Sequence, residues 1–108
     1  MRREHGMYEG LSLAETERLI KLQEECAEVI QIAAKVLIYG YEEVNILELD
    51  GPNNKERLEK ELGDVIYWIE QMYLNKDINE VNILNHADAK HCKAKKYTRY
   101  QEGSEWNR

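Results

Sequence analysis

Two groups of acidic residues are the part of this sequence best suited to chemistry. Glu24, Glu25 and Glu28 form the first group, and Glu61 and Asp64 form the second. Within each group carboxylates recur three or four residues apart, so on a helix they project from one side. Apolar residues flank both groups, and carboxylates on a core-facing surface repel one another and lose hydration unless a cation joins them. The sequence therefore predicts a divalent-metal site inside a helical bundle.

An acidic pair on its own carries little information, because the chain has 21 acidic residues among 108. Either group alone is what a solvated, charged helix face would look like. Two groups on two helices, each with apolar flanks and no internal lysine, favour the metal site instead. Carboxylates, water and phosphate oxygens are the ligands that Mg²⁺ prefers, and Mn²⁺ can substitute for it. We expect the ligands to be Glu25, Glu28, Glu61 and Asp64.

Ser12 and Glu15 form a capping box that begins the first expected helix. Helical periodicity continues over residues 13–38 without glycine or proline, and Gly40 ends it. The second half of this helix is apolar nearly all round, which suits a helix surrounded by partners, a second subunit among them. Its expected core stripe consists of Leu19, Leu22, Cys26, Val29 or Ile30, Ala33 and Leu37.

Residues 40–54 have the composition of a connection, because they contain Gly40, Gly51 and Pro52, the only proline of the chain. Residues 43–49 inside it form either a short extra helix or a lid. Asn53 or Asn54 then caps a second helix that runs to about residue 74, and Gly63 within it would allow a helix or a substrate to approach closely. Its expected core stripe consists of Leu58, Leu62, Val65 or Ile66, Ile69 and Met72 or Tyr73.

Asp77 with Glu80 resembles a further capping box, which would begin a third helix through about residue 97. The predicted fold class is therefore all-α. Three basic residues of this last helix, Lys93, Lys96 and Arg99, follow one another at i,i+3 spacing. They either complement the helix dipole at its C-terminus or contact a polyphosphate.

Trp68 lies one turn beyond Asp64 and shares its face of the second helix. Its indole ring is suited to stacking on a nucleobase near metal-bound phosphates. Packing in the core is the other interpretation, and the sequence leaves both open.

The composition restricts the classes of protein that this chain fits. We expect one domain, residues 1–108, with its core at about residues 12–100. The net charge of −6 argues against binding of a nucleic acid polymer or an anionic membrane, but not of a nucleotide. No apolar stretch is long enough for a signal peptide or a membrane span. Two cysteines outside any CxxC pair indicate reduced thiols and a cytoplasmic protein.

The acidic pattern resembles the signature of a known enzyme family. Glu24-Glu25-x-x-Glu28, followed by Glu61-x-x-Asp64, is similar to the EExxE…ExxD motif of the MazG-like, all-α nucleoside triphosphate pyrophosphohydrolases. The strings LQEECAEVIQ at 22–31 and ELGDVIYW at 61–68 extend the resemblance. It covers roughly residues 12–100 and is closest to the small single-domain members, including those of phages.

The resemblance implies a helical bundle that is completed by dimerisation, as a homodimer or homotetramer. It implies Mg²⁺ ligands at the same four carboxylates, with Glu24 assisting the metal or the attacking water. The implied reaction is hydrolysis of a nucleoside triphosphate to the monophosphate and pyrophosphate. Glu24 or Glu28 would orient that water or take its proton, and the basic residues of the third helix would contact substrate phosphates.

Two other classes of protein remain as alternatives. The first is a non-catalytic helical interaction module, or a degenerate relative that keeps an acidic metal-binding face. The second is a carboxylate-bridged di-iron bundle, which uses Glu-x-x-His pairs. No such pair occurs in this sequence, and Asp88-x-x-His91 is the nearest pattern.

Overall fold

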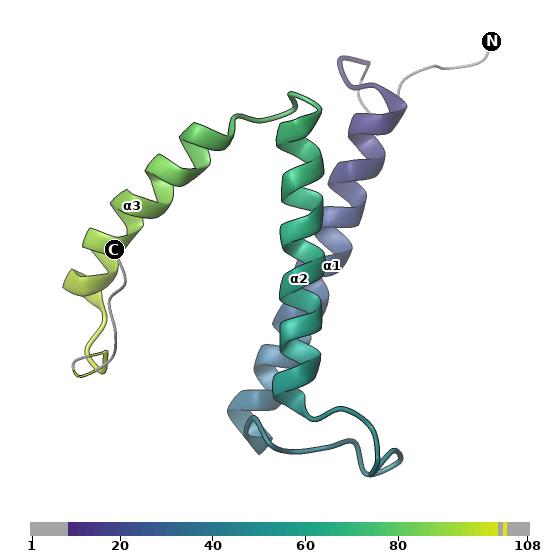
Figure 1. Ribbon diagram of the computed structural model, residues 1–108, viewed down its shortest axis with the longest axis vertical. Helices are drawn as coiled ribbons and strands as arrows, with labels where there is room; N and C mark the ends of the chain where they lie inside the picture. The colour runs from purple at the N-terminus through teal and green to yellow at the C-terminus, as the bar shows by residue number, and fades with distance from the viewer. Residues whose placement is uncertain (1–8, 102, 104–108) are drawn as a thin grey trace. The chain divides into compact units, whose positions relative to one another are not determined.

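The computed structural model describes residues 9–101 and Gly103, and these residues form three helices and no strand (Figure 1). The helices are α1 (Leu13–Tyr39), α2 (Asn54–Leu74) and α3 (Glu80–Tyr97). The predicted all-α class is confirmed. The chain divides after Asp77 into two compact units, the first with α1 and α2 and the second with α3. No helix among the described residues is both long and apolar enough to cross a membrane.

The helix ends of α1 form as the sequence predicts. The amide of Glu15 donates to the hydroxyl of Ser12 at 3.0 Å, and the Glu15 carboxylate accepts from the Ser12 amide at 3.0 Å. Both halves of the predicted capping box are therefore present. Gly40 ends the helix with a positive φ of 88°, and its amide donates to the carbonyl of Val36. A residue without a Cβ adopts this conformation at little cost.

Asn53, and not Asn54, is the N-cap of α2, and it forms a capping box with Glu56. Asn54 is buried instead, and its side-chain amide donates to the carbonyl of Gly40 at 3.1 Å. Residues 43–49 form turns rather than the helix that was one of two predictions for this segment. The connection is held near the helices by an isolated antiparallel bridge between Val44 and Asn53.

The capping box predicted from Asp77 and Glu80 is wrong. Asn79 is the N-cap of α3, where its side chain accepts from the amide of Asn82 at 3.0 Å. The carboxylate of Asp77 instead accepts two hydrogen bonds from the guanidinium of Arg18 on α1, at 2.6 and 2.9 Å. A bidentate, largely shielded ion pair of this kind outweighs a cap at an exposed helix end.

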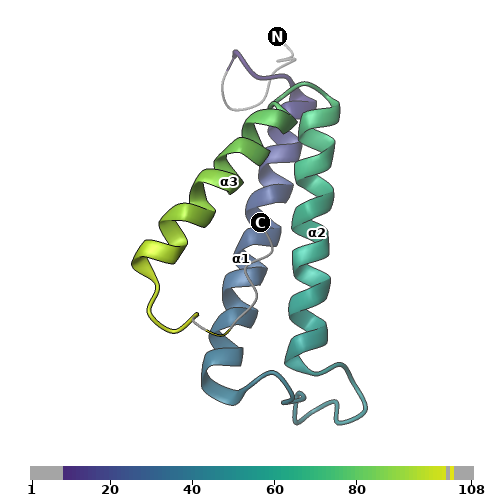
Figure 2. The same cartoon turned by 60° about the vertical axis from the view of Figure 1, so that its left-hand side comes forward.

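Helices α1 and α2 lie side by side and run in opposite directions, as both views show (Figures 1 and 2). Their shielded positions alternate at spacings of three and four residues, the heptad pattern of an antiparallel coiled coil. The most buried apolar side chains are Ile32 at 9% exposed and Met72 at 6%. The seam, meaning this row of facing positions, consists of Arg18, Leu22, Glu25, Val29, Ile32 and Val36 on α1 and Leu58, Glu61, Val65, Trp68 and Met72 on α2.

The predicted core stripe of α1 coincides with the observed seam at Leu22 and Val29 but departs from it at other positions. Leu19, Cys26 and Leu37 are exposed in the first unit, and Leu37 is 87% exposed. They lie about 100° around the helix from Arg18, Glu25 and the other seam positions. Charged residues occupy two α1 positions of the seam, Arg18 and Glu25, so counting apolar residues alone selects part of the neighbouring stripe.

The displaced stripe gives the α1–α2 pair an apolar face, which consists of Leu19, Ile30 and Leu37 of α1 and Leu62 and Ile66 of α2. Each of these residues follows a seam position by one helical step. Because the two helices are antiparallel, the five side chains fall on one side of the pair. Glu28 and Asp64 lie on the opposite side.

Candidate metal centre

Three carboxylates meet in the middle of the α1–α2 seam. Glu25 and Glu28 project from successive turns of α1, and Glu61 faces them from α2. One oxygen of each carboxylate lies within 4.8 Å of an oxygen of the others. The structure thus brings together three of the four predicted ligands, and we call them the carboxylate triad.

Two oxygens of the triad are buried without a hydrogen-bond partner among the described residues. They are Oε2 of Glu25 and Oε2 of Glu61. A buried acceptor that is left unpaired carries the full cost of its lost hydration. A cation between the helices would satisfy both atoms, and three oxygen ligands suit Mg²⁺ or Mn²⁺. The donor set therefore fits the predicted metal.

The close packing of the three carboxylates also raises the affinity of Glu25 and Glu28 for protons. Loss of hydration raises the pKa of Glu25 to about 7, and hydrogen bonding with Glu61 and the charges of Asp64 and Glu28 contribute. Hydrogen bonding with Glu61 also raises the pKa of Glu28, followed by the charge of Glu61. Below about pH 7 Glu25 therefore retains a proton, which offsets part of the negative charge that a bound cation would otherwise neutralise.

Asp64 lies next to the triad but is engaged by a lysine. Nζ of Lys60 is 2.9 Å from Oδ2 of Asp64 and 3.5 Å from Oε1 of Glu61. Hydrogen bonding to Asp64 raises the pKa of Lys60, so the lysine remains charged. The sequence prediction missed this residue, although it precedes Glu61 directly and lies at i,i+4 spacing from Asp64.

Glu24 lies outside the carboxylate triad. Its side chain is exposed and forms a 3.5 Å ion pair with Lys21. It projects about 100° around α1 from Glu25, so the two carboxylates point in different directions. Its predicted role beside the metal or the attacking water stays a prediction.

Trp68 occupies the α1–α2 seam, two turns beyond Glu61 on the same helix. It is partly buried and meets the ring of Tyr67 edge to face, with centroids 5.0 Å apart.

Gly63 faces away from α1, and a Cβ placed there would meet no atom of the described chain within 4 Å. The close approach to another helix predicted at Gly63 is therefore absent from this part of the chain.

The predicted basic residues belong to the second unit. Lys93 and Lys96 lie on α3, both exposed, and Nζ of Lys96 is 5.6 Å from the ring centroid of Tyr97. Thr98 caps the helix in extended conformation, so Arg99 lies beyond the helix end. The three residues thus do not follow one helical face, and their contact with phosphates stays a prediction.

Comparison with known proteins gives no match to a family model, to a curated protein or to a solved structure. The assignment of function therefore depends on the residues of this chain and their geometry.

Proposed function

We propose that this protein is a Mg²⁺-dependent hydrolase that converts nucleoside triphosphates to the monophosphate and pyrophosphate. The carboxylate triad, with its two unpaired buried oxygens, is the observation that carries the proposal. It supports a cation site at the triad, and the resemblance of the acidic motifs to the EExxE…ExxD pattern supports the choice of reaction.

Glu25, Glu28 and Glu61 would hold the metal, and Asp64 would join them when Lys60 turns away from it. Bound Mg²⁺ would neutralise charge on phosphate oxygens and favour ionisation of a nearby water. Lys60 is then free to donate to a phosphate oxygen, because it already reaches the edge of the triad. This exchange keeps the charge of the site balanced as substrate arrives.

The reaction needs a group that accepts the proton of the attacking water. Oxygen of the water bonds to the α-phosphorus, the bond from that phosphorus to the oxygen bridging to the β-phosphate breaks, and pyrophosphate leaves. Glu28 and Glu24 are the candidates for the proton, because both side chains are exposed to solvent. Lys93, Lys96 and Arg99 would offset the charge of the leaving pyrophosphate.

The proposed state of the enzyme is a homodimer or homotetramer, in a helical bundle that subunits complete together. The exposed apolar face of the α1–α2 pair supports this, because such surfaces mark association sites. Both cysteines are free thiols, which suits the proposed cytoplasmic location.

The test is a panel of common NTPs and dNTPs with Mg²⁺ or Mn²⁺, in which pyrophosphate and orthophosphate are measured separately. We expect metal-dependent release of pyrophosphate. Glu61→Gln with Asp64→Asn should lower kcat/KM at least about a hundredfold, the scale of metal and acid–base assistance. Glu59→Gln, an exposed glutamate on the same helix, is the matched control and should retain activity. Full turnover in the double variant would overturn the proposal.

A non-catalytic interaction module is the second candidate, and the exposed apolar face is the observation that favours it. In that case Mg²⁺ with a nucleotide would raise the melting temperature, and no nucleotide of the panel would be hydrolysed. The same panel assay therefore separates the two functions.

A further inference from the structure

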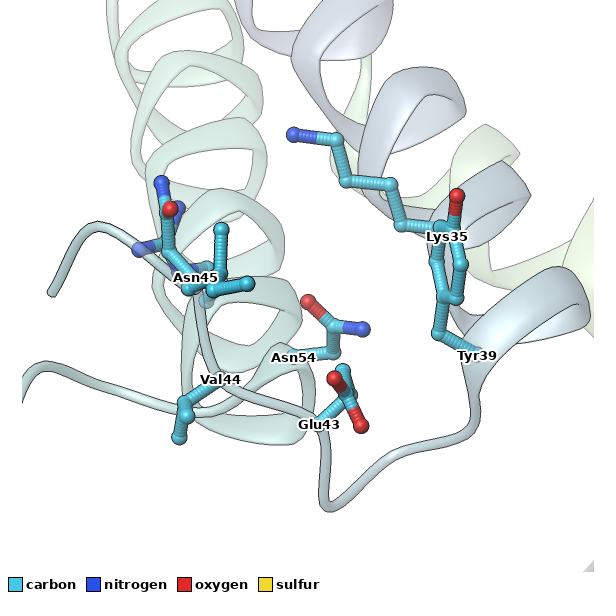
Figure 3. A pocket seen from close by; sticks show the side chains of 8 residues that line it. Lys35, Tyr39, Glu43, Val44, Asn45 and Asn54 are labelled. Atoms are coloured by element: carbon cyan, nitrogen blue, oxygen red, sulfur yellow. The ribbon is translucent and has the colours of Figure 1, made fainter. Parts of the chain in front are cut away.

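A cavity of about 380 Å³ lies in the first unit, where the end of α1 meets the connection and the start of α2 (Figure 3). Its helical walls are Lys35 and Tyr39 of α1 and Asn54 and Arg57 of α2, and residues 43–46 of the connection close it. This volume is in the range of small-molecule sites, roughly 300–1,000 Å³.

The cavity is next to the carboxylate triad on the same side of the helix pair. Lys35 follows Glu28 by two turns, about 10 Å along α1, and points in nearly the same direction. Arg57 precedes Glu61 by about one turn, roughly 6 Å along α2. A molecule held at the triad by its phosphates could therefore extend into the cavity.

The walls combine flat apolar surface with a buried amide. The ring of Tyr39 stands on one side (Figure 3), and Val44 and Ile46 line the cavity from the connection. Asn54 points into the cavity and is 6% exposed (Figure 3). Its hydrogen bond from Nδ2 to the carbonyl of Gly40 leaves the amide oxygen and a second N–H for a ligand. A nucleobase could stack its face on the Tyr39 ring and pair its polar edge with the donor and the acceptor of the Asn54 amide.

Two basic residues, Lys35 and Arg57, and one acidic residue, Glu43, line the cavity. Lys35 reaches across it (Figure 3) and forms no ion pair or hydrogen bond with any residue of the described ranges. Arg57 is held more firmly, by a bond from Nε to the carbonyl of Pro52 at 3.3 Å and by a 3.6 Å ion pair with Glu48. Lys35 is therefore the cation that can move to an incoming phosphate.

We propose that this cavity binds the base and sugar of the nucleotide, while Lys35 contacts a phosphate between the cavity and the carboxylate triad. The inference rests on the proposed function and gives it a substrate orientation. It places the base beside Tyr39. Trp68, for which stacking on a nucleobase was one of two predicted roles, lies at the opposite end of the triad.

The test compares nucleotide and inorganic tripolyphosphate as ligands. Tyr39→Ala should weaken binding of a non-hydrolysable α,β-methylene dNTP about tenfold or more, as expected for loss of a base-stacking ring. Its affinity for tripolyphosphate and for Mn²⁺ should not change. Lys35→Met should weaken both nucleotide and tripolyphosphate. Tyr41→Ala and Lys55→Met are the matched controls, because neither residue lines the cavity.

Ile46→Trp is a second variant, which fills the cavity from the connection without changing any residue of the helices, and it should weaken nucleotide binding alone. Three results would overturn the inference: equal loss of nucleotide and tripolyphosphate in Tyr39→Ala, unchanged nucleotide binding in both cavity variants, or no nucleotide binding by wild-type protein that binds Mn²⁺.

The outcome is separable from that of the proposed function. Nucleotide binding that depends on Tyr39, without hydrolysis of any triphosphate, would support the cavity and refute the enzyme. Hydrolysis that is unchanged by the Tyr39 and Ile46 substitutions would support the enzyme and refute the cavity as the base site.

Discussion

Metal affinity should depend on pH in a range where ordinary carboxylates do not titrate. The pKa of Glu25 is raised to about 7, so near neutrality a metal ion must displace a proton from the carboxylate triad. At pH 8 about ten in eleven Glu25 side chains are ionised, and at pH 6 about one in eleven. Mn²⁺ should therefore bind about tenfold more weakly at pH 6 than at pH 8, with a limiting slope of about one decade per pH unit.

The stability of the metal-free protein should have the opposite dependence on pH. The folded state holds the Glu25 proton more tightly than the unfolded chain, whose carboxyl has the ordinary pKa of 4.5. This group therefore contributes stability below pH 4.5, and the contribution is lost as the pH rises through about 7. Added Mg²⁺ should restore stability at the upper end of this window, where the triad is ionised.

Titration of free Mn²⁺ by electron paramagnetic resonance at constant ionic strength measures the affinity, and thermal unfolding with EDTA or Mg²⁺ measures the stability. Glu25→Gln should bind Mn²⁺ weakly and lose the slope near pH 7. The exposed Glu59→Gln variant should keep the wild-type curve. An affinity that stays level from pH 8 to 6 and falls only below pH 5 would refute the raised pKa and the crowding inferred for the triad.

Three further substitutions test other parts of the molecule. Lys60→Gln removes the cation that engages Asp64, so Mn²⁺ should bind roughly two- to fivefold more tightly, the worth of an exposed ion pair; weaker binding would mean that Lys60 helps to build the site. Gly63→Ala should raise the free energy of unfolding by about 1 kcal/mol in a denaturant titration, because the space beside it is open; a loss would reveal a partner packed there. Leu37→Glu places a charge on the exposed apolar face, so sedimentation should shift toward the monomer while the helix content stays intact. A wild-type protein that is monomeric at every concentration would contradict the proposed oligomer.

The helices could be predicted from the sequence because their ends are determined locally. Ser12 and Glu15 are close in sequence, and Gly40 needs only its own backbone to end α1. The prediction for the start of α3 was wrong because it depended on a contact distant in the sequence. Asp77 has a cap-forming sequence context, but its partner Arg18 lies 59 residues away, and no local pattern announces that pair.

The carboxylate triad could be predicted in part. Their spacing, together with the apolar flanks of both acidic groups, predicted Glu25, Glu28 and Glu61 as neighbours across two helices. Which side of α1 faces α2 was not predictable from apolar residues, because Arg18 and Glu25 occupy seam positions that leucine usually fills. The cavity was also beyond reach, since turns between residues 43 and 49 build one wall of it and their path has no periodicity to read.

The composition of the seam connects the proposed function to the stability of the fold. Glu25 and Glu61 take central heptad positions, and the apolar side chains displaced from the seam lie exposed on the side of the pair away from Glu28 and Asp64. Among the described residues of the first unit only Ile32 and Met72 are buried apolar residues, so the α1–α2 pair has little core of its own. A cation at the triad would remove the repulsion between the helices, and a second copy over the apolar face would supply the missing burial. The two requirements act on opposite faces of the same helices, so metal binding and association should stabilise the protein together without competing for surface.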